Sequence, residues 1–158
     1  MMKQHFNKLT ALAICLLLCS VTVLGSKKPK QEMYQLTVYQ YTTAQQEATL
    51  DSYLKDALLP ALHKNGYKNI GVFKSLANDT AKIKTMFVYM PVKNVADQLL
   101  LTEKLNKDTA YQSAGAAYLN AVYTAPPYSR MEIILLKAFH LAPQMQLPML
   151  TAPKSERV

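Results

Sequence analysis

The order in which two kinds of hydrophobic spacing alternate along the chain most constrains its fold. Between residues 33 and 139, stretches typical of β-strands and stretches with helical spacing follow one another as strand, helix, strand, strand, helix, strand. Helices placed between strands in this order can cover only one face of a four-stranded sheet. We therefore expect an α+β fold, ferredoxin-like with the order βαββαβ.

The first strand and the first helix have clear signals. Residues 33–41, MYQLTVYQY, are rich in Tyr, Val and Thr and predict a strand with two occupied faces. One face takes Tyr34, Leu36 and Val38, and the other takes Met33, Thr37, Tyr39 and Tyr41. Thr43 and Gln46 then form a capping box for a long helix that ends at Asn65-Gly66, with a kink at Pro60.

The next two strands and the last strand are read from alternation and turn residues. Extended stretches at 69–75 and 82–90, joined by a polar turn around Asn78-Asp79, predict a hairpin with a longer loop. The last strand spans 128–139, and its continuous apolar run 133–136 predicts that both of its faces are covered.

Two further helices lie between the hairpin and the last strand. Asn94 can cap a helix that runs through Leu105, and Asp108 can cap a second that runs through Leu119. The Pro126-Pro127 pair ends the helical region.

The N-terminus is typical of a secretory signal. Lys3 and Lys8 precede the uncharged, largely apolar stretch 9–24, which is shorter than the roughly 20 residues that a spanning helix needs. We expect cleavage after Gly25 and a location in the periplasm or outside the cell, with no integral membrane span afterwards. An uncleaved anchor is the alternative, and lipidation is disfavoured because no small residue precedes either cysteine.

Cleavage would remove both cysteines together with two lysines. The 18 Lys and Arg residues then become 16 against 10 Asp and Glu, a net charge of +6, and thiolate chemistry is excluded. The remaining lysines are scattered rather than clustered with aromatics, which argues against nucleic acid as a partner. We expect four segments: a signal peptide at 1–25, a basic linker at 26–32, one domain at 33–140 and an extended Pro-containing tail at 141–158.

The sheet face that the helices leave open also looks apolar. We expect Met33, Tyr39, Tyr41 and the last strand to form an exposed patch there, and such a patch usually marks an interface. A symmetric homodimer through the open sheet face is the simplest way to cover it.

Several segments together resemble the NIPSNAP family in its exported bacterial form. They are MYQLTVYQY, LKDALLPALHKNGYKNIGVFK, KDTAYQSAGAAYLNA, PPYSRMEIILLKAF and the closing APKSERV. The resemblance implies a ferredoxin-like domain of the dimeric α/β barrel type, in which two sheets enclose a cavity, but it implies no settled chemistry.

Two departures from the family pattern stand out. Gln35-Leu36-Thr37 replaces the Glu-Leu-Arg step that is usual in the first strand, so an ion pair supplied there elsewhere is absent. Related exported proteins resemble two tandem copies of the domain, the second opening after a Ser-Glu-Arg-Val stretch. This chain stops at that stretch, which fits either a natural single domain or a truncated two-domain protein.

Few side chains in the sequence are candidates for ligand binding or catalysis. Arg130 and Glu132, two apart on the last strand, share a face with Tyr128 and could present a cation, a carboxylate and a phenol to a small hydrophobic ligand, with Tyr39 and Tyr41 nearby. The simpler interpretation is a neutralised pair at a sheet edge or a dimer contact. His63 is most simply a surface residue at a helix C-terminus, and otherwise a general base or an axial haem ligand.

No arrangement of residues points to a reaction. The sequence contains no glycine-rich phosphate loop, no nucleophile elbow and no metal-ligand spacing, so we expect no metal site and no cofactor. We predict a noncatalytic dimeric binding or interaction module with a hydrophobic cavity. The alternatives are a small cofactor-independent oxygenase or isomerase acting on a hydrophobic ligand in the barrel, and a haem-binding variant.

Overall fold

A computed structural model describes residues 30–147 of the chain. Its sheet is four-stranded and antiparallel, in the order β2-β3-β1-β4, and its strands are β1 (Met33–Tyr41), β2 (Gly71–Lys74), β3 (Lys84–Val92) and β4 (Arg130–Lys137). Its helices are α2 (Ala44–Ser52), α3 (Leu59–Lys64), α4 (Val95–Lys107), α5 (Thr109–Ala114) and α6 (Ala116–Leu119). This confirms the α+β, ferredoxin-like fold.

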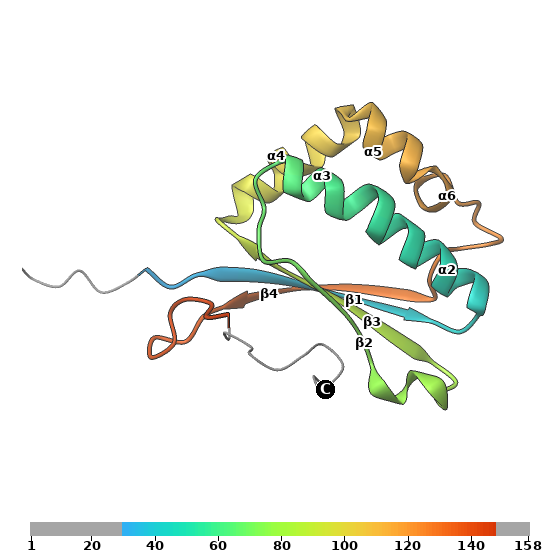
Figure 1. Ribbon diagram of the computed structural model, residues 1–158, viewed down its shortest axis with the longest axis horizontal. Coiled ribbons are helices and arrows are strands. Elements are labelled where there is room, and N and C mark those ends of the chain that lie inside the picture. The colour runs from blue at the N-terminus through green and yellow to red at the C-terminus, as the bar shows by residue number, and fades with distance from the viewer. Residues whose placement is uncertain (1–29, 148–158) are drawn as a thin grey trace, which may run out of the picture.

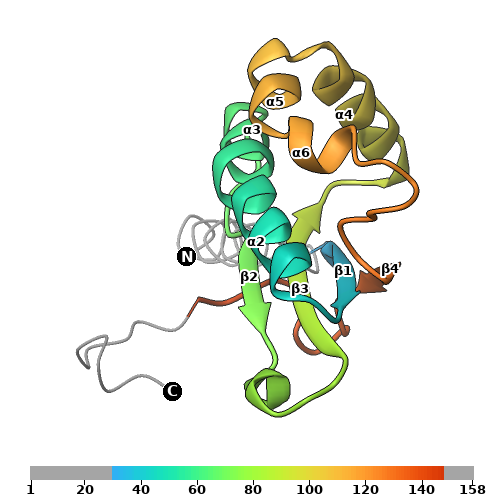
Figure 2. The same cartoon turned by 90° about the vertical axis from the view of Figure 1, so that its right-hand side faces the viewer.

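The helices form one layer and the sheet forms the other. Figure 1 shows α2 to α6 on the same side of the sheet, with β1 and β4 crossing beneath them. Figure 2, turned by 90°, shows α2 and α3 beside α4 to α6, again above the strands. Within residues 30–147, therefore, no helix lies over the opposite face of the sheet.

The first helix is capped as predicted but changes its winding midway. The Thr43 hydroxyl accepts a hydrogen bond from the Gln46 N–H at 3.1 Å, and the Gln46 side chain accepts from the Thr43 N–H. Between α2 and α3 the chain forms a wider π-helical segment, Tyr53–Leu58, which ends just before Pro60. A proline cannot donate to the carbonyl four residues back and its ring crowds that carbonyl, so a locally wider turn accommodates it.

Of the two helices predicted after the hairpin, the second is divided into two. Asn94 caps α4 and Asp108 caps α5, both by accepting backbone N–H bonds. The predicted helix from Asp108 to Leu119 is split at Gly115 into α5 and α6. A β-carbon at Gly115 would lie 3.3 Å from the Ala57 β-carbon, so the glycine allows this point to pack closely against the π-helical segment.

The hydrophobic core lies between the sheet and the helices. β1 contributes Tyr39 and Tyr41, and β3 contributes Met86, Val88 and Met90 from the same face of the sheet. From the helices the core takes Leu50, Tyr53, Leu54, Ala57, Ala61, Leu62, Leu101, Leu105 and Tyr111. The expectation that Met33, Tyr39 and Tyr41 form the exposed patch was wrong, because their face of β1 is the one that the helices cover.

β4 differs from its prediction in length and in burial. It is shorter than the predicted 128–139 stretch, and residues 30–147 cover its apolar side chains only partly on either face. Ile133 and Leu135 on one face are 57% and 47% exposed, and Ile134 and Leu136 on the other are 38% and 39% exposed. Within the described sheet, β4 is an edge strand that pairs only with β1.

Several expectations fall outside the described residues. The predicted signal peptide at 1–25, most of the linker at 26–32 and the end of the tail at 148–158 belong to this group. Within residues 30–147, no helix is both long enough and apolar enough to cross a membrane.

Candidate functional site

The face of the sheet without helices is the first candidate site, and we call it the open sheet face. Strand register assigns to it alternate residues of each strand, because directly opposed residues of antiparallel strands point the same way. They are Tyr34, Leu36, Val38, Gln40, Phe73, Thr85, Phe87, Tyr89, Pro91, Arg130, Glu132, Ile134 and Leu136. Most of these side chains are apolar or aromatic, and Phe73 is more than half exposed.

Arg130 and Glu132 are the charged strand residues of the open sheet face. As predicted they share a face, lying opposite Gln40 and Val38 of β1. The Arg130 Nε lies 2.7 Å from a Glu132 carboxylate oxygen, and the two side chains are 66% and 40% exposed. The pair is therefore neutral as a unit and faces solvent in the single chain.

Tyr128 does not join that pair. β4 begins at Arg130, so the strand alternation does not extend back to Tyr128. Its ring instead packs 5.7 Å from Tyr39 and 6.0 Å from Tyr118, on the helix side of the sheet. The prediction that these three residues share one face was wrong for Tyr128.

Tyr39 and Tyr128 belong to a cluster of five tyrosines beneath the helices, with Tyr53, Tyr111 and Tyr118. The rings of Tyr53 and Tyr118 stack with their centres 3.8 Å apart, and the hydroxyls of Tyr53 and Tyr111 are 2.8 Å apart. Burial raises the pKa of Tyr39, Tyr53 and Tyr118, so these phenols stay neutral. Because these tyrosines are neutral, largely buried and in contact with one another, their main role is to form part of the hydrophobic core.

Tyr41 and His63 are also separated from the Arg130–Glu132 pair. Tyr41 is fully buried, and its hydroxyl accepts a hydrogen bond from Asn78 at 3.2 Å. His63 is exposed on α3 and lines neither of the two main pockets of the described chain. The geometry therefore gives no support to haem binding through His63, and residues 30–147 hold no group of three or more His, Cys, Asp or Glu residues arranged for a metal ion.

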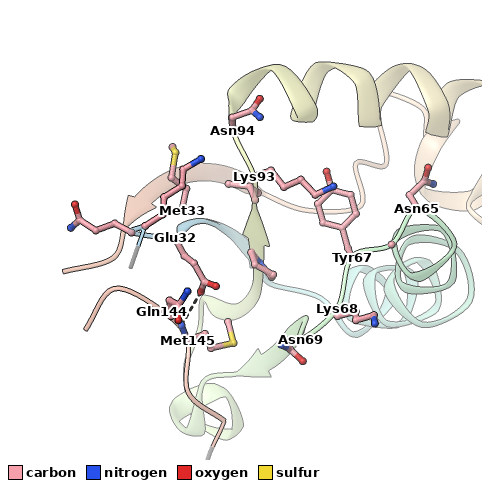
Figure 3. A pocket seen from close by; sticks show the side chains of 15 residues that line it. Glu32, Met33, Asn65, Tyr67, Lys68, Asn69, Lys93, Asn94, Gln144 and Met145 are labelled. Atoms are coloured by element: carbon pink, nitrogen blue, oxygen red, sulfur yellow. Dashed lines mark hydrogen bonds between the residues drawn. The ribbon is translucent and has the colours of Figure 1, made fainter. Parts of the chain in front are cut away.

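The sequence did not reveal a pocket that lies at one end of the sheet (Figure 3). It has a volume of about 700 Å³ and is built where β1 begins, β3 ends and α4 begins. The turn after α3 and the segment at Gln144 and Met145 complete it. Its lining comes from segments far apart in the sequence, so no local pattern marks it.

Known structures share the fold of this chain. A NIPSNAP family protein from Agrobacterium tumefaciens superposes with a TM-score of 0.54 at 14% identity, covering 73% of this chain and 92% of that one. A second from the same organism, described as a NIPSNAP family protein with unknown function, gives a TM-score of 0.53 at 16% identity and covers 73% and 95%. No family model and no curated protein sequence matches the chain.

These similarities confirm the α+β, ferredoxin-like part of the fold that the resemblance implied. The structural neighbours are NIPSNAP family proteins, and they match over nearly their whole length. At this level of identity the likeness concerns the fold alone, so any function must be argued from the residues of this chain.

Proposed function

We propose that this chain is a noncatalytic interaction module that pairs with a second copy of itself through the open sheet face, in the periplasm or outside the cell. The observation that carries the proposal is an apolar sheet face without helices, bordered by an edge strand whose apolar residues are exposed on both sides. On this face the exposed apolar side chains are Phe73, Ile134 and Leu136 on the two edge strands, and the central strands between them add half-buried apolar side chains. A contiguous apolar surface of this kind favours an interface.

The charge on the open sheet face supports a second copy as the occupant. The whole chain carries a formal net charge of +8, which opposes self-association. At the strand positions of this face, however, the only ionised groups are Arg130 and Glu132, which neutralise one another at 2.7 Å. Two such faces can therefore approach without like-charge repulsion.

The exposed position of that pair also favours an interaction module over an enzyme. A catalytic Arg–Glu pair in the oxygenase or isomerase alternative would have to point into an enclosed apolar cavity. Both side chains instead face solvent in the single chain, and neither lines a main pocket. Two sheets packed face to face could still enclose an apolar space for a small hydrophobic ligand.

A charge placed on the edge strand of the open sheet face tests the proposal. Ile134→Glu puts an unpaired carboxylate opposite Leu36, whereas Tyr123→Glu adds the same charge at a 98% exposed position outside the strands. We expect sedimentation velocity to show a dimer for the unmodified chain and for Tyr123→Glu, and a monomer for Ile134→Glu. A monomeric unmodified chain, or a dimer that survives Ile134→Glu, would overturn the proposal.

A further inference from the structure

The pocket at the end of the sheet carries more positive than negative charge. Lys30, Lys68 and Lys93 line it, with Glu32 as its one acidic residue, so three cations face one anion and the lining has a net charge of +2. Within residues 30–147, none of the three lysines forms an ion pair. Figure 3 shows the Lys93 side chain extending towards Tyr67.

Glu32 already accepts two hydrogen bonds on one carboxylate oxygen and forms no ion pair with these lysines. Its carboxylate accepts hydrogen bonds from the Met145 N–H at 2.8 Å and from the Tyr34 hydroxyl at 2.7 Å. These bonds lower the pKa of Glu32, so it is ionised at neutral pH and holds the segment around Met145 against the start of β1. Its role is to build one wall of the pocket.

Neutral donors line the same pocket as the lysines. The side chains of Asn69 and Gln144 and the hydroxyl of Tyr67 have no hydrogen-bond partner among the residues that the structure describes. Burial and the nearby Asp97 carboxylate raise the pKa of Tyr67, so its hydroxyl keeps its proton at neutral pH. All three groups can donate to an anion.

The turn that brings these groups together has a specific backbone. Gly66 and Asn69 adopt positive φ angles of 84° and 57°, the left-handed conformation that glycine and asparagine tolerate best. Beside this turn the pocket also has apolar wall residues, namely Met33, Pro91, Val92 and Met145.

We propose that this pocket binds a small organic molecule that carries two negative charges, with its anionic groups on Lys68 and Lys93 and its carbon skeleton against the apolar wall. A volume of about 700 Å³ is within the usual range for small-molecule sites. Lysines without ion pairs, next to donors without partners, favour an anion over a neutral ligand. The site shares Pro91 with the open sheet face, but its three lysines lie outside the strand positions of that face, so the proposal does not rest on dimer formation.

Calorimetric titration with two dianions and one monoanion tests this site. The probes are glycerol phosphate, succinate and acetate, added to protein purified from cells that express the full chain. We expect glycerol phosphate or succinate to bind with a Kd of about 1 mM or tighter, and acetate to bind at least tenfold more weakly. The better of the two dianions identifies the anionic group, phosphate or carboxylate.

Charge variants separate a specific site from general attraction to a basic protein. Lys93→Ala and Lys68→Ala should each weaken dianion binding about fivefold, while Lys104→Ala, on the exposed surface of α4 and outside the pocket, should leave it unchanged. Circular dichroism checks that all variants fold. No binding of either dianion, equal binding of acetate, or equal loss in Lys104→Ala would overturn the proposal.

Discussion

The Tyr53–Tyr111 pair makes a sharp prediction about the core. Both side chains are about 6% exposed, and their hydroxyls are 2.8 Å apart between the π-helical segment and α5. Tyr53→Phe or Tyr111→Phe removes one hydroxyl and leaves the other buried without its partner. A net hydrogen bond contributes about 1 kcal/mol, and an unsatisfied buried hydroxyl costs about 1–3 kcal/mol, so each single variant should lose about 1–2 kcal/mol of unfolding free energy.

The double variant distinguishes this account from a simple loss of polar atoms. Once both hydroxyls are gone no buried polar group is orphaned, so Tyr53→Phe/Tyr111→Phe should be no less stable than either single variant. The stacking of Tyr53 on Tyr118 is kept because phenylalanine retains the ring. Urea unfolding measures all four proteins, with Tyr123→Phe as an exposed control. Additive losses in the double variant would refute the reasoning.

Two further predictions concern the hairpin and its ion pairs. Asn78 is buried and joins its loop to Tyr41 and Thr85 through three hydrogen bonds of 2.9–3.2 Å. Asn78→Ala should therefore lower the free energy of unfolding, measured in urea, by about 2–3 kcal/mol. The neighbouring control Asp79→Ala should change it little. Lys74 donates to Glu47 at 2.7 Å and lowers the pKa of that carboxyl below its ordinary 4.5. The Lys74–Glu47 ion pair therefore stabilises the folded protein above pH 4.5, and this stabilisation is lost as the pH falls through the lowered pKa of folded Glu47. Lys74→Ala should therefore lower the free energy of unfolding by less than about 1 kcal/mol at pH 7 and by almost nothing near pH 3. A penalty for Lys74→Ala that stays constant with pH would contradict this assignment.

The sequence predicted the positions of the helices and strands better than it predicted which face of a strand is buried. The bounds of β1 and the caps at Thr43, Asn94 and Asp108 are local signals, and all were confirmed. The buried face of β1 was not predictable, because Tyr34, Leu36 and Val38 on one face are as apolar as the tyrosines on the other. Packing of the helices on Tyr39 and Tyr41 decides between them, and this choice depends on residues distant in the sequence.

The candidate site was also predicted only as far as local sequence patterns allow. Arg130 and Glu132 were placed on one face correctly because the two-residue repeat of a strand requires it. Tyr128 was misplaced because the strand begins two residues later, and strand ends are the least predictable feature of such patterns. The lysines of the pocket shown in Figure 3 come from different segments, and only the tertiary fold brings them together.

Native mass spectrometry of the chain recovered from the cells that make it tests the central claim most directly. Self-pairing through the open sheet face predicts a species of twice the chain mass, with Ile134→Glu reducing it to a single chain under the same conditions. A monomer at all accessible concentrations would contradict the account, because the apolar residues of β4 would then face solvent in the working protein.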